Sequence, residues 1–245
     1  MDGHLALAAM RAPRTALALP LAAPIPGQIT LGTVLGAALN HPDEFARLAP
    51  AMHAAPYQLP PQRPVLYLKP ANTHCPDGSA IVLDRDVEQI CIAPCVALVL
   101  AAPLSRASAD SAAAAILGYT LAADLSVPHV SLYRPAIRDK CRDGFLPLGP
   151  ALIPAHAVEL ASLTLTLTID GQPVLQVRPR DLLRQAIALL VEISRFMHCA
   201  AGDVLLLGPS QTETFAVPDA AMSLEAHGLG TLRFTLTRAG AGGRS

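Results

Sequence analysis

Residues 163–177, LTLTLTIDGQPVLQV, decide the fold class of this chain. Every second residue from 163 to 169 is leucine or isoleucine with threonine between, which is the period of a strand with one buried face. The alternation runs into Asp170-Gly171, and an Asp-Gly pair between alternating runs is the strongest short-range signal for a β-hairpin. The stretch therefore predicts two antiparallel strands joined by a tight turn.

Apolar runs on either side of this hairpin predict further strands. The longest run, residues 91–101, contains no charged side chain, so we expect it to be buried on both faces. Shorter strands are expected at 29–39, 65–68, 81–83, 119–125 and 204–207, and a second alternating stretch at 222–237. This order lacks a regular βαβ alternation and predicts a β-rich α+β fold with few helices.

Three helices are expected between these strands. The first, at 45–48, follows the polar segment NHPDE. The second is alanine-rich, begins at a cap formed by Ser108 or Asp110, and runs to about Leu117. The third covers 181–198, where apolar residues recur at the helical period over about four to five turns. We interpret its apolar stripe as core.

Composition narrows the classes of function. A formal net charge of -1 excludes the strongly basic surface that binds nucleic acid or an anionic membrane, so we expect a small-molecule or protein partner. Five cysteines, an odd number, suit a reducing compartment, and we expect a cytoplasmic protein. Residues 15–40 are uncharged over a length that would cross a bilayer, but Pro20, Pro24 and Pro26 argue against a membrane helix.

Eight segments, taken in order, carry a family resemblance. They are YLKPANTH (67–74), VALVLA (96–101), ILGYTLAADLS (116–126), KCRDGFLPLGP (140–150), TIDGQPV (168–174), SRFM (194–197), GDVLLLGP (202–209) and GLGTLR (228–233). Together they resemble the fumarylacetoacetate hydrolase family. Within it, ALNH, KPxNT and YRPAI followed by KCRDGF are similar to the N-terminal half, or separate first subunit, of homoprotocatechuate-pathway isomerase/decarboxylases. We accordingly divide the chain into an N-terminal extension (1–28), this domain (29–238) and a flexible tail (239–245).

The resemblance implies a mixed β-roll with a few peripheral helices. It also implies a divalent cation, magnesium or manganese, that binds the oxo and carboxylate oxygens of a 2-oxo acid and stabilises an enolate. The implied substrates are 5-oxopent-3-ene-1,2,5-tricarboxylate for decarboxylation and 2-hydroxyhepta-2,4-diene-1,7-dioate for isomerisation. We expect a homodimer, which the 52% of hydrophobic residues favours, or a hetero-oligomer with a second family subunit that carries the metal ligands.

The family's metal ligands are a Glu-x-Glu pair on one strand and an aspartate on a later strand. Ala93 and Cys95 take the two glutamate positions here, and Asp124 keeps the third. Because a hard cation prefers several oxygen ligands, the resemblance implies an eroded metal site. Asp124 could instead have a structural role, or Glu88 could replace a missing metal ligand. Cys91 and Cys95 have a C-x3-C spacing that could bind zinc, but ordinary buried thiols are the stronger interpretation.

Basic residues close to the YRPAI motif are candidates for substrate contacts. Lys140 matches the family's pocket lysine, which pairs with a substrate carboxylate or assists charge development, and is our first catalytic candidate. Tyr133, Arg138 and Arg142 flank it and could clamp a dicarboxylate. The two arginines could equally pair with neighbouring aspartates. Lys69, at the start of the KPxNT-like loop, is a further substrate-binding candidate.

His41 and Glu44 are the remaining catalytic candidates. They have the spacing of the His-x-x-Glu pair of several family enzymes, in which the glutamate orients the histidine as a general base. Alignment on Asn40 would instead place the family pair at Glu44 and Arg47. A capping role for this loop is the alternative interpretation.

Three hypotheses of function remain open. The first is a subunit of a homoprotocatechuate-pathway isomerase/decarboxylase whose decarboxylation chemistry comes largely from a partner. The second is a catalytically silent subunit that shapes the partner's pocket or interface. The third is an independent, metal-free tautomerase of a 2-oxo acid that uses Asp124, Lys140 and His41.

Overall fold

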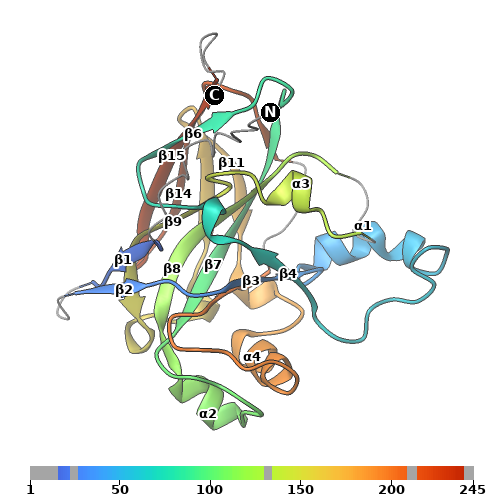
Figure 1. The fold of residues 1–245 in the computed structure, drawn as a ribbon, viewed down its shortest axis with the longest axis vertical. Helices are drawn as coiled ribbons and strands as arrows, with labels where there is room; N and C mark the ends of the chain where they lie inside the picture. The colour runs from blue at the N-terminus through green and yellow to red at the C-terminus, as the bar shows by residue number, and fades with distance from the viewer. Residues whose placement is uncertain (1–15, 23–26, 130–133, 209–213, 240–245) are drawn as a thin grey trace, which may run out of the picture.

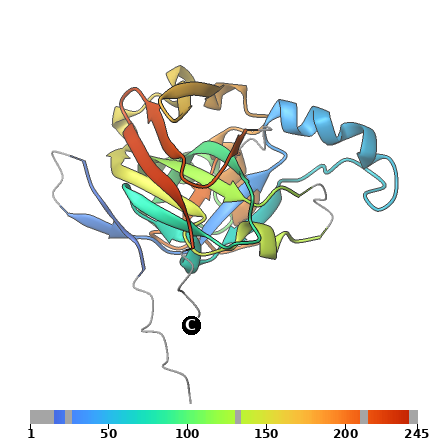
Figure 2. The ribbon, with the colours of Figure 1, turned by 90° about the horizontal axis from the view of Figure 1, so that it is seen from above.

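The computed structural model describes residues 16–22, 27–129, 134–208 and 214–239. Strands dominate these residues and the helices are short and peripheral, which confirms the predicted β-rich α+β class (Figure 1). Two mixed sheets pack against each other, and the pair β1 (Ala18–Pro20) and β2 (Gln28–Thr30) lies beside them (Figure 2).

The larger sheet has eight strands. In hydrogen-bonded order they are β4 (Val65–Lys69), β3 (Val34–Ala38), β12 (Val204–Leu206), β7 (Ile90–Leu100), β8 (Ile116–Ser126), β9 (Leu146–Pro154) and β5 (His74–Cys75), with β13 (Phe215–Ala216) also paired to β7. The β12–β3 and β5–β9 pairs are parallel and the others antiparallel. The predicted strand 29–39 is therefore two strands, β2 and β3, in different sheets.

The smaller sheet contains the hairpin predicted from 163–177. Its order is β11 (Gln172–Val177), β10 (Leu165–Ile169), β14 (Ala221–Ala226), β15 (Gly230–Arg238) and β6 (Ser79–Leu83). Strands β10 and β11 turn at Asp170 and Gly171, whose φ angles of 48° and 78° are both positive, as a tight hairpin turn requires. The predicted hairpin is confirmed.

Strand β7 is the centre of the core, and every one of its residues is buried. Val96 and Leu98 on one face pack into a cluster shared with the smaller sheet. Ala97 and Val99 on the opposite face pack into a second cluster that includes Leu19 of β1. The two-sided burial expected for 91–101 is therefore confirmed, and the β1–β2 pair helps to cover the outer face.

The helices and 3-10 turns are α1 (Pro42–Met52), α2 (Ala109–Ala114), α3 (Ile137–Lys140), α4 (Ala186–Ser194), η1 (Ala71–Thr73), η2 (Ala155–Ala157), η3 (Leu160–Ser162) and η4 (Pro179–Asp181). Helix α1 is longer than predicted. Ser108 caps α2 as expected, but the helix ends at Ala114 because β8 already begins at Ile116. Within the described ranges, no helix is both long and apolar enough to cross a bilayer.

Helix α4 begins later than its apolar period predicted. The 3-10 turn η4 comes first, and the two residues after Leu182 bond to a distant residue, Asn40. The backbone N–H groups of Leu183 and Arg184 donate to the carbonyl and side-chain oxygens of Asn40, at 2.9 and 2.8 Å, and the Asn40 amide donates to the Arg184 carbonyl at 2.9 Å. These long-range bonds use the backbone groups of residues 183 and 184, and the helix starts only after them.

The larger sheet is curled, and this curl creates the site. Strands β3, β12 and β7 separate β4 from β8, which in a flat sheet would place them about 19 Å apart. Yet the hydroxyl of Tyr67 on β4 lies 2.6 Å from a carboxylate oxygen of Asp124 on β8. The ring crosses β3 at Gly36, where a Cβ atom would overlap it. A glycine on β3 therefore lets the Tyr67 ring reach Asp124.

Candidate active site

Asp124 is the centre of the site. It lies on β8 directly opposite Ala93 of β7, so both residues point to the same face of the sheet, as does Cys95 two residues along. The Asp124 side chain has no solvent exposure. The three positions that the family resemblance brings together do lie together, but only Asp124 carries a carboxylate.

Two ammonium groups neutralise this carboxylate, and they belong to the only lysines in the sequence, Lys69 and Lys140. Lys69 Nζ lies 2.9 Å from Asp124 Oδ1, and Lys140 Nζ lies 2.6 Å from Oδ2. The Lys69 side chain is fully buried and that of Lys140 is 9% exposed. Lys69 comes from the end of β4 and Lys140 from α3, so the cluster links three distant elements.

Tyr67 completes the cluster. Its hydroxyl donates to Asp124 Oδ2 at 2.6 Å, and Lys140 Nζ lies 4.7 Å from the centre of its ring, a cation–π distance. Burial raises the pKa of Tyr67 well above its ordinary value, and the Asp124 charge raises it further. The phenol is therefore held as a proton donor to the carboxylate.

The charge state of Asp124 follows from these contacts. Burial alone would raise its pKa, but the ammonium groups of Lys140 and Lys69, with hydrogen bonds from Lys140 and Tyr67, lower the pKa to about 2. Burial lowers the pKa of Lys69, and the Asp124 charge opposes this effect. Asp124 is consequently an anion at neutral pH.

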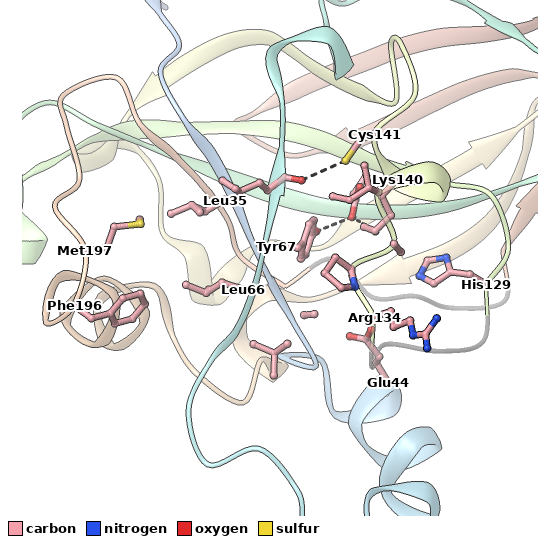
Figure 3. A pocket seen from close by; sticks show the side chains of 17 residues that line it. Leu35, Glu44, Leu66, Tyr67, His129, Arg134, Lys140, Cys141, Phe196 and Met197 are labelled. Atoms are coloured by element: carbon pink, nitrogen blue, oxygen red, sulfur yellow. Dashed lines mark hydrogen bonds and ion pairs between the residues drawn. The ribbon is translucent and has the colours of Figure 1, made fainter. Parts of the chain in front are cut away.

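A cavity of about 580 Å³ opens beside the cluster. It lies between β3, β4, the start of α1, the segment around α3 and the turn after α4 (Figure 3). Its lining includes Leu35, Ala38, Glu44, Val65, Leu66, Tyr67, Leu68, Asp124, His129, Arg134, Pro135, Ala136, Ile137, Lys140, Cys141, Phe196 and Met197. This volume is in the range of small-molecule sites.

Glu44 is the second carboxyl group in the cavity. It lies in the first turn of α1, is only 2% exposed, and accepts a hydrogen bond from the Leu39 backbone N–H at 2.9 Å. Burial, only partly opposed by that hydrogen bond and by Lys140, raises the pKa of Glu44 to about 7. A carboxyl group with this pKa exchanges its proton near neutral pH, which suits a general acid or base.

The other predicted residues are placed differently. His41 caps α1, with its Nδ1 accepting from the Asp43 N–H at 3.3 Å, and it is not among the residues that line the cavity. Arg142 pairs with Asp84 at 2.7 Å. Exposed Arg138 lies 3.8 Å from an oxygen of Asp86. Tyr133 lies outside the described residues. The predicted cap is therefore present, while the partners of the arginines are not the adjacent aspartates that the sequence offered.

Three of the polar residues that line the cavity, Tyr67, His129 and Arg134, were not predicted. Tyr67 had a signal in the sequence, because it stands two residues before Lys69 on the same strand and must point to the same face. His129 and Arg134 flank the YRPAI segment, but nothing in their spacing distinguishes them from surface residues. Only the curled sheet and the position of α3 bring them to the cavity (Figure 3).

Residues 33–237 match the sequence profile described as fumarylacetoacetate (FAA) hydrolase C-terminal. The chain belongs to the fumarylacetoacetate hydrolase family. It is 37% identical over 201 residues to the 4-hydroxyphenylacetate degradation bifunctional isomerase/decarboxylase of Salmonella dublin, with 82% of this chain and 46% of that protein covered. The chain thus spans about half the length of the curated bifunctional relatives it matches.

Two more distant likenesses accompany this one. Oxaloacetate tautomerase YcgM of Escherichia coli is 28% identical over 60% of this chain and 70% of that protein. The crystal structure of 5-carboxymethyl-2-hydroxymuconate delta-isomerase from Mycobacterium smegmatis superposes with a TM-score of 0.71 at 26% identity, covering 86% of this chain and 79% of that one. The fold predicted from the resemblance is confirmed by these matches.

The donor atoms of this family member do not fit a divalent cation. Ala93 has no donor, and burial together with the Asp124 charge raises the pKa of Cys95 well above its ordinary value, which keeps the thiol protonated. Both Asp124 oxygens already face ammonium or hydroxyl groups. Glu88 is exposed and offers no compensation. In the part of the chain that the structure describes, no three His, Cys, Asp or Glu side chains form a metal-binding group.

Asp124→Asn tests the buried charge cluster. The substitution preserves the shape of the side chain but leaves two ammonium groups without their counter-charge, so we expect the free energy of unfolding to fall by about 3–5 kcal/mol. Urea denaturation at pH 7 measures it. Arg142→Met, which breaks the more exposed pair with Asp84, is the control and should cost less than about 1 kcal/mol. A loss for Asp124→Asn as small as that of the control would contradict the cluster.

Glu44→Gln tests the raised pKa of Glu44. The folded protein binds this proton more tightly than the unfolded chain, so the stability from this group is complete below pH 4.5 and is lost as the pH rises through about 7. Between pH 4.5 and 7, the free energy of unfolding of the wild type should fall by up to about 3 kcal/mol relative to that of Glu44→Gln. Each unit of pKa shift corresponds to about 1.4 kcal/mol. Urea denaturation of both proteins from pH 4.5 to 8 measures this difference. If the free energies of unfolding of the two proteins change in parallel with pH, the raised pKa of Glu44 is refuted.

Proposed function

We propose that this chain is a subunit of an isomerase/decarboxylase in the meta-cleavage pathway of 4-hydroxyphenylacetate or homoprotocatechuate. The enzyme would act on 5-oxopent-3-ene-1,2,5-tricarboxylate and 2-hydroxyhepta-2,4-diene-1,7-dioate. Decarboxylation would take place in a second family subunit that carries both glutamates and a divalent cation. This chain would support that partner and would have no metal-dependent step of its own.

The donor set around Asp124 is the observation that carries this proposal. Loss of carbon dioxide from a 2-oxo acid leaves an enolate, which needs a strongly positive centre beside the oxo oxygen. With Ala93 and a protonated Cys95 beside Asp124, this chain lacks the carboxylates that would hold such a cation. The match to about half of a bifunctional relative supports the idea that a second family unit supplies them.

A reconstitution assay tests this function. The purified chain with manganese should decarboxylate the tricarboxylate at no more than the uncatalysed rate, and addition of a glutamate-bearing family subunit should give activity together with a stable complex. Size-exclusion chromatography measures the complex and carbon dioxide release the reaction. Full decarboxylation by the chain alone would rule out the proposal. So would a partner whose activity and elution volume do not change when this chain is added.

A second candidate function, metal-independent tautomerisation of a 2-oxo acid, is favoured by the pairing of Glu44 and Lys140 in one cavity. The Glu44 carboxylate would take a proton from the carbon next to the oxo group, and the Lys140 ammonium would stabilise the resulting enolate oxygen. The Lys140 ammonium would then give a proton to that oxygen to form the enol, and the proton held by Glu44 would pass through water to Lys140, which restores both groups. The likeness to an oxaloacetate tautomerase supports this reading of the pocket.

Tautomerisation of oxaloacetate and phenylpyruvate in the presence of EDTA tests this second function. The rate should rise with pH through about 7, as Glu44 loses its proton. Glu44→Gln should lower kcat by about 100-fold or more, because the general base is gone. Ultraviolet absorbance of the enol follows the reaction, and Arg142→Met serves as the matched control. An unaltered rate in Glu44→Gln would eliminate this role.

A further inference from the structure

The oxygen atoms of Asp124 are already occupied by protein groups. Tyr67 Oη and Lys140 Nζ each donate to Oδ2 at 2.6 Å, and Lys69 Nζ lies 2.9 Å from Oδ1. A carboxylate oxygen offers about two lone-pair sites, so the two donors fill those of Oδ2. A magnesium ion binds such an oxygen at about 2.0–2.1 Å, closer than either donor lies, and it would have to displace one of them.

The Tyr67 hydroxyl lies beside the positions of the family's two glutamates. Ala93 is paired directly with Asp124 across β7 and β8, and Cys95 follows two residues along on the same face. Burial raises the pKa of Tyr67 most, and the charges of Asp124 and Cys95 raise it further, so the phenol is close to both. Lys140 matches a lysine that the family pattern keeps together with the cation. Tyr67 is therefore the donor that would have to leave.

The space that two glutamate side chains would need is closed as well. Protein interiors are densely packed, so a loss of buried side-chain volume leaves a void unless a neighbour fills it. Ala93 and Cys95 are buried, and neither lines the 580 Å³ cavity. Cys95 borders a separate hollow of about 10 Å³, which is too small for a carboxylate side chain. Tyr67 does line the cavity, and its ring runs from there to Asp124.

Gly36 is what gives the ring its place. It pairs directly with Tyr67 across β3 and β4. A Cβ atom on Gly36 would overlap the hydroxyl end of the Tyr67 ring, and the three atoms that it would meet first all belong to that side chain. The φ angle of Gly36 is not in the left-handed region, so space and not backbone conformation explains the glycine. Any other residue at position 36 would push the ring away from Asp124.

We propose that Tyr67, seated on Gly36, is an internal plug that takes the place of the family's divalent cation beside Asp124. Exclusion of the cation then depends on residues 36 and 67 as well as on the loss of both glutamates. Glutamates at positions 93 and 95 do not restore a metal site while the ring is present. This inference goes beyond the proposed function, because it concerns the chain alone and holds whether or not a partner subunit supplies the decarboxylation chemistry.

Manganese binding tests the plug. Ala93→Glu with Cys95→Glu brings back the two carboxylates, and the same pair with Tyr67→Ala also removes the ring. The paramagnetic resonance signal of free manganese, which falls as the ion binds, measures the affinity of each variant. The ring-free variant should bind manganese at least about tenfold more tightly, because the ion no longer displaces a hydrogen bond to a charged group. Asp124→Asn in the ring-free variant should abolish this binding, since the ion loses a carboxylate.

Val82→Glu with Val174→Glu, also combined with Tyr67→Ala, is the matched control. It adds the same number of carboxylates at exposed positions of β6 and β11, and it should bind no manganese. Circular dichroism establishes that each variant is folded. Equal affinity with and without the ring, or no binding by a folded ring-free variant, would overturn the proposal.

A second measurement needs neither metal nor added charge. Gly36→Ala should lower the urea midpoint of the wild type, because the Tyr67 ring must leave Asp124. In a Tyr67→Ala background the same substitution should lower the midpoint by less than about half as much, since the two residues are in contact. This comparison uses residues 36 and 67 alone, so it decides the matter even where a glutamate variant does not fold. An equal loss in both backgrounds would show that the ring is not seated on Gly36 and would disprove the plug.

Discussion

The buried ion cluster of Asp124 with Lys69 and Lys140 is the constraint on which the site depends. An isolated carboxylate without solvent contact is strongly unfavourable, and so is an isolated buried ammonium group. Each of these groups is tolerated only because the other two are present. The strand β4, the strand β8 and the helix α3 must therefore come together in one arrangement, and the curl of the larger sheet is the geometry that permits it.

The cavity follows from this arrangement. With β4 curled toward β8, the Tyr67 side chain faces Asp124 and the space beside α3. The same strand that carries the counter-ion Lys69 thus also forms one wall of the pocket. Helix α1 forms another part of it, because the cap at His41 fixes its start and turns Glu44 inward.

The sequence predicted what depends on local pattern and missed what depends on distant contacts. Alternation and an Asp-Gly turn predicted the β10–β11 hairpin, and an uncharged run predicted the buried strand β7. The start of α4 was wrong, because Asn40, far away in the chain, holds the preceding backbone. For the site, the family resemblance predicted that Ala93, Cys95 and Asp124 lie together. No pattern in the sequence predicts that the sheet curls, so the position of the Tyr67 ring across Gly36 could not be predicted.

Charge arithmetic explains how the family's scaffold accommodates the change at this site. The family pattern has two glutamates, with two negative charges, beside a dication. Loss of both glutamates together with the cation leaves the total charge unchanged, so the remaining aspartate and the lysines need not adjust. Loss of the two glutamates without the cation, or of the cation without the glutamates, would leave an excess of two charges in a buried space, which costs several kcal/mol. With Ala93 and Cys95 at these positions, the counter-charges of Asp124 are the ammonium groups of Lys69 and Lys140.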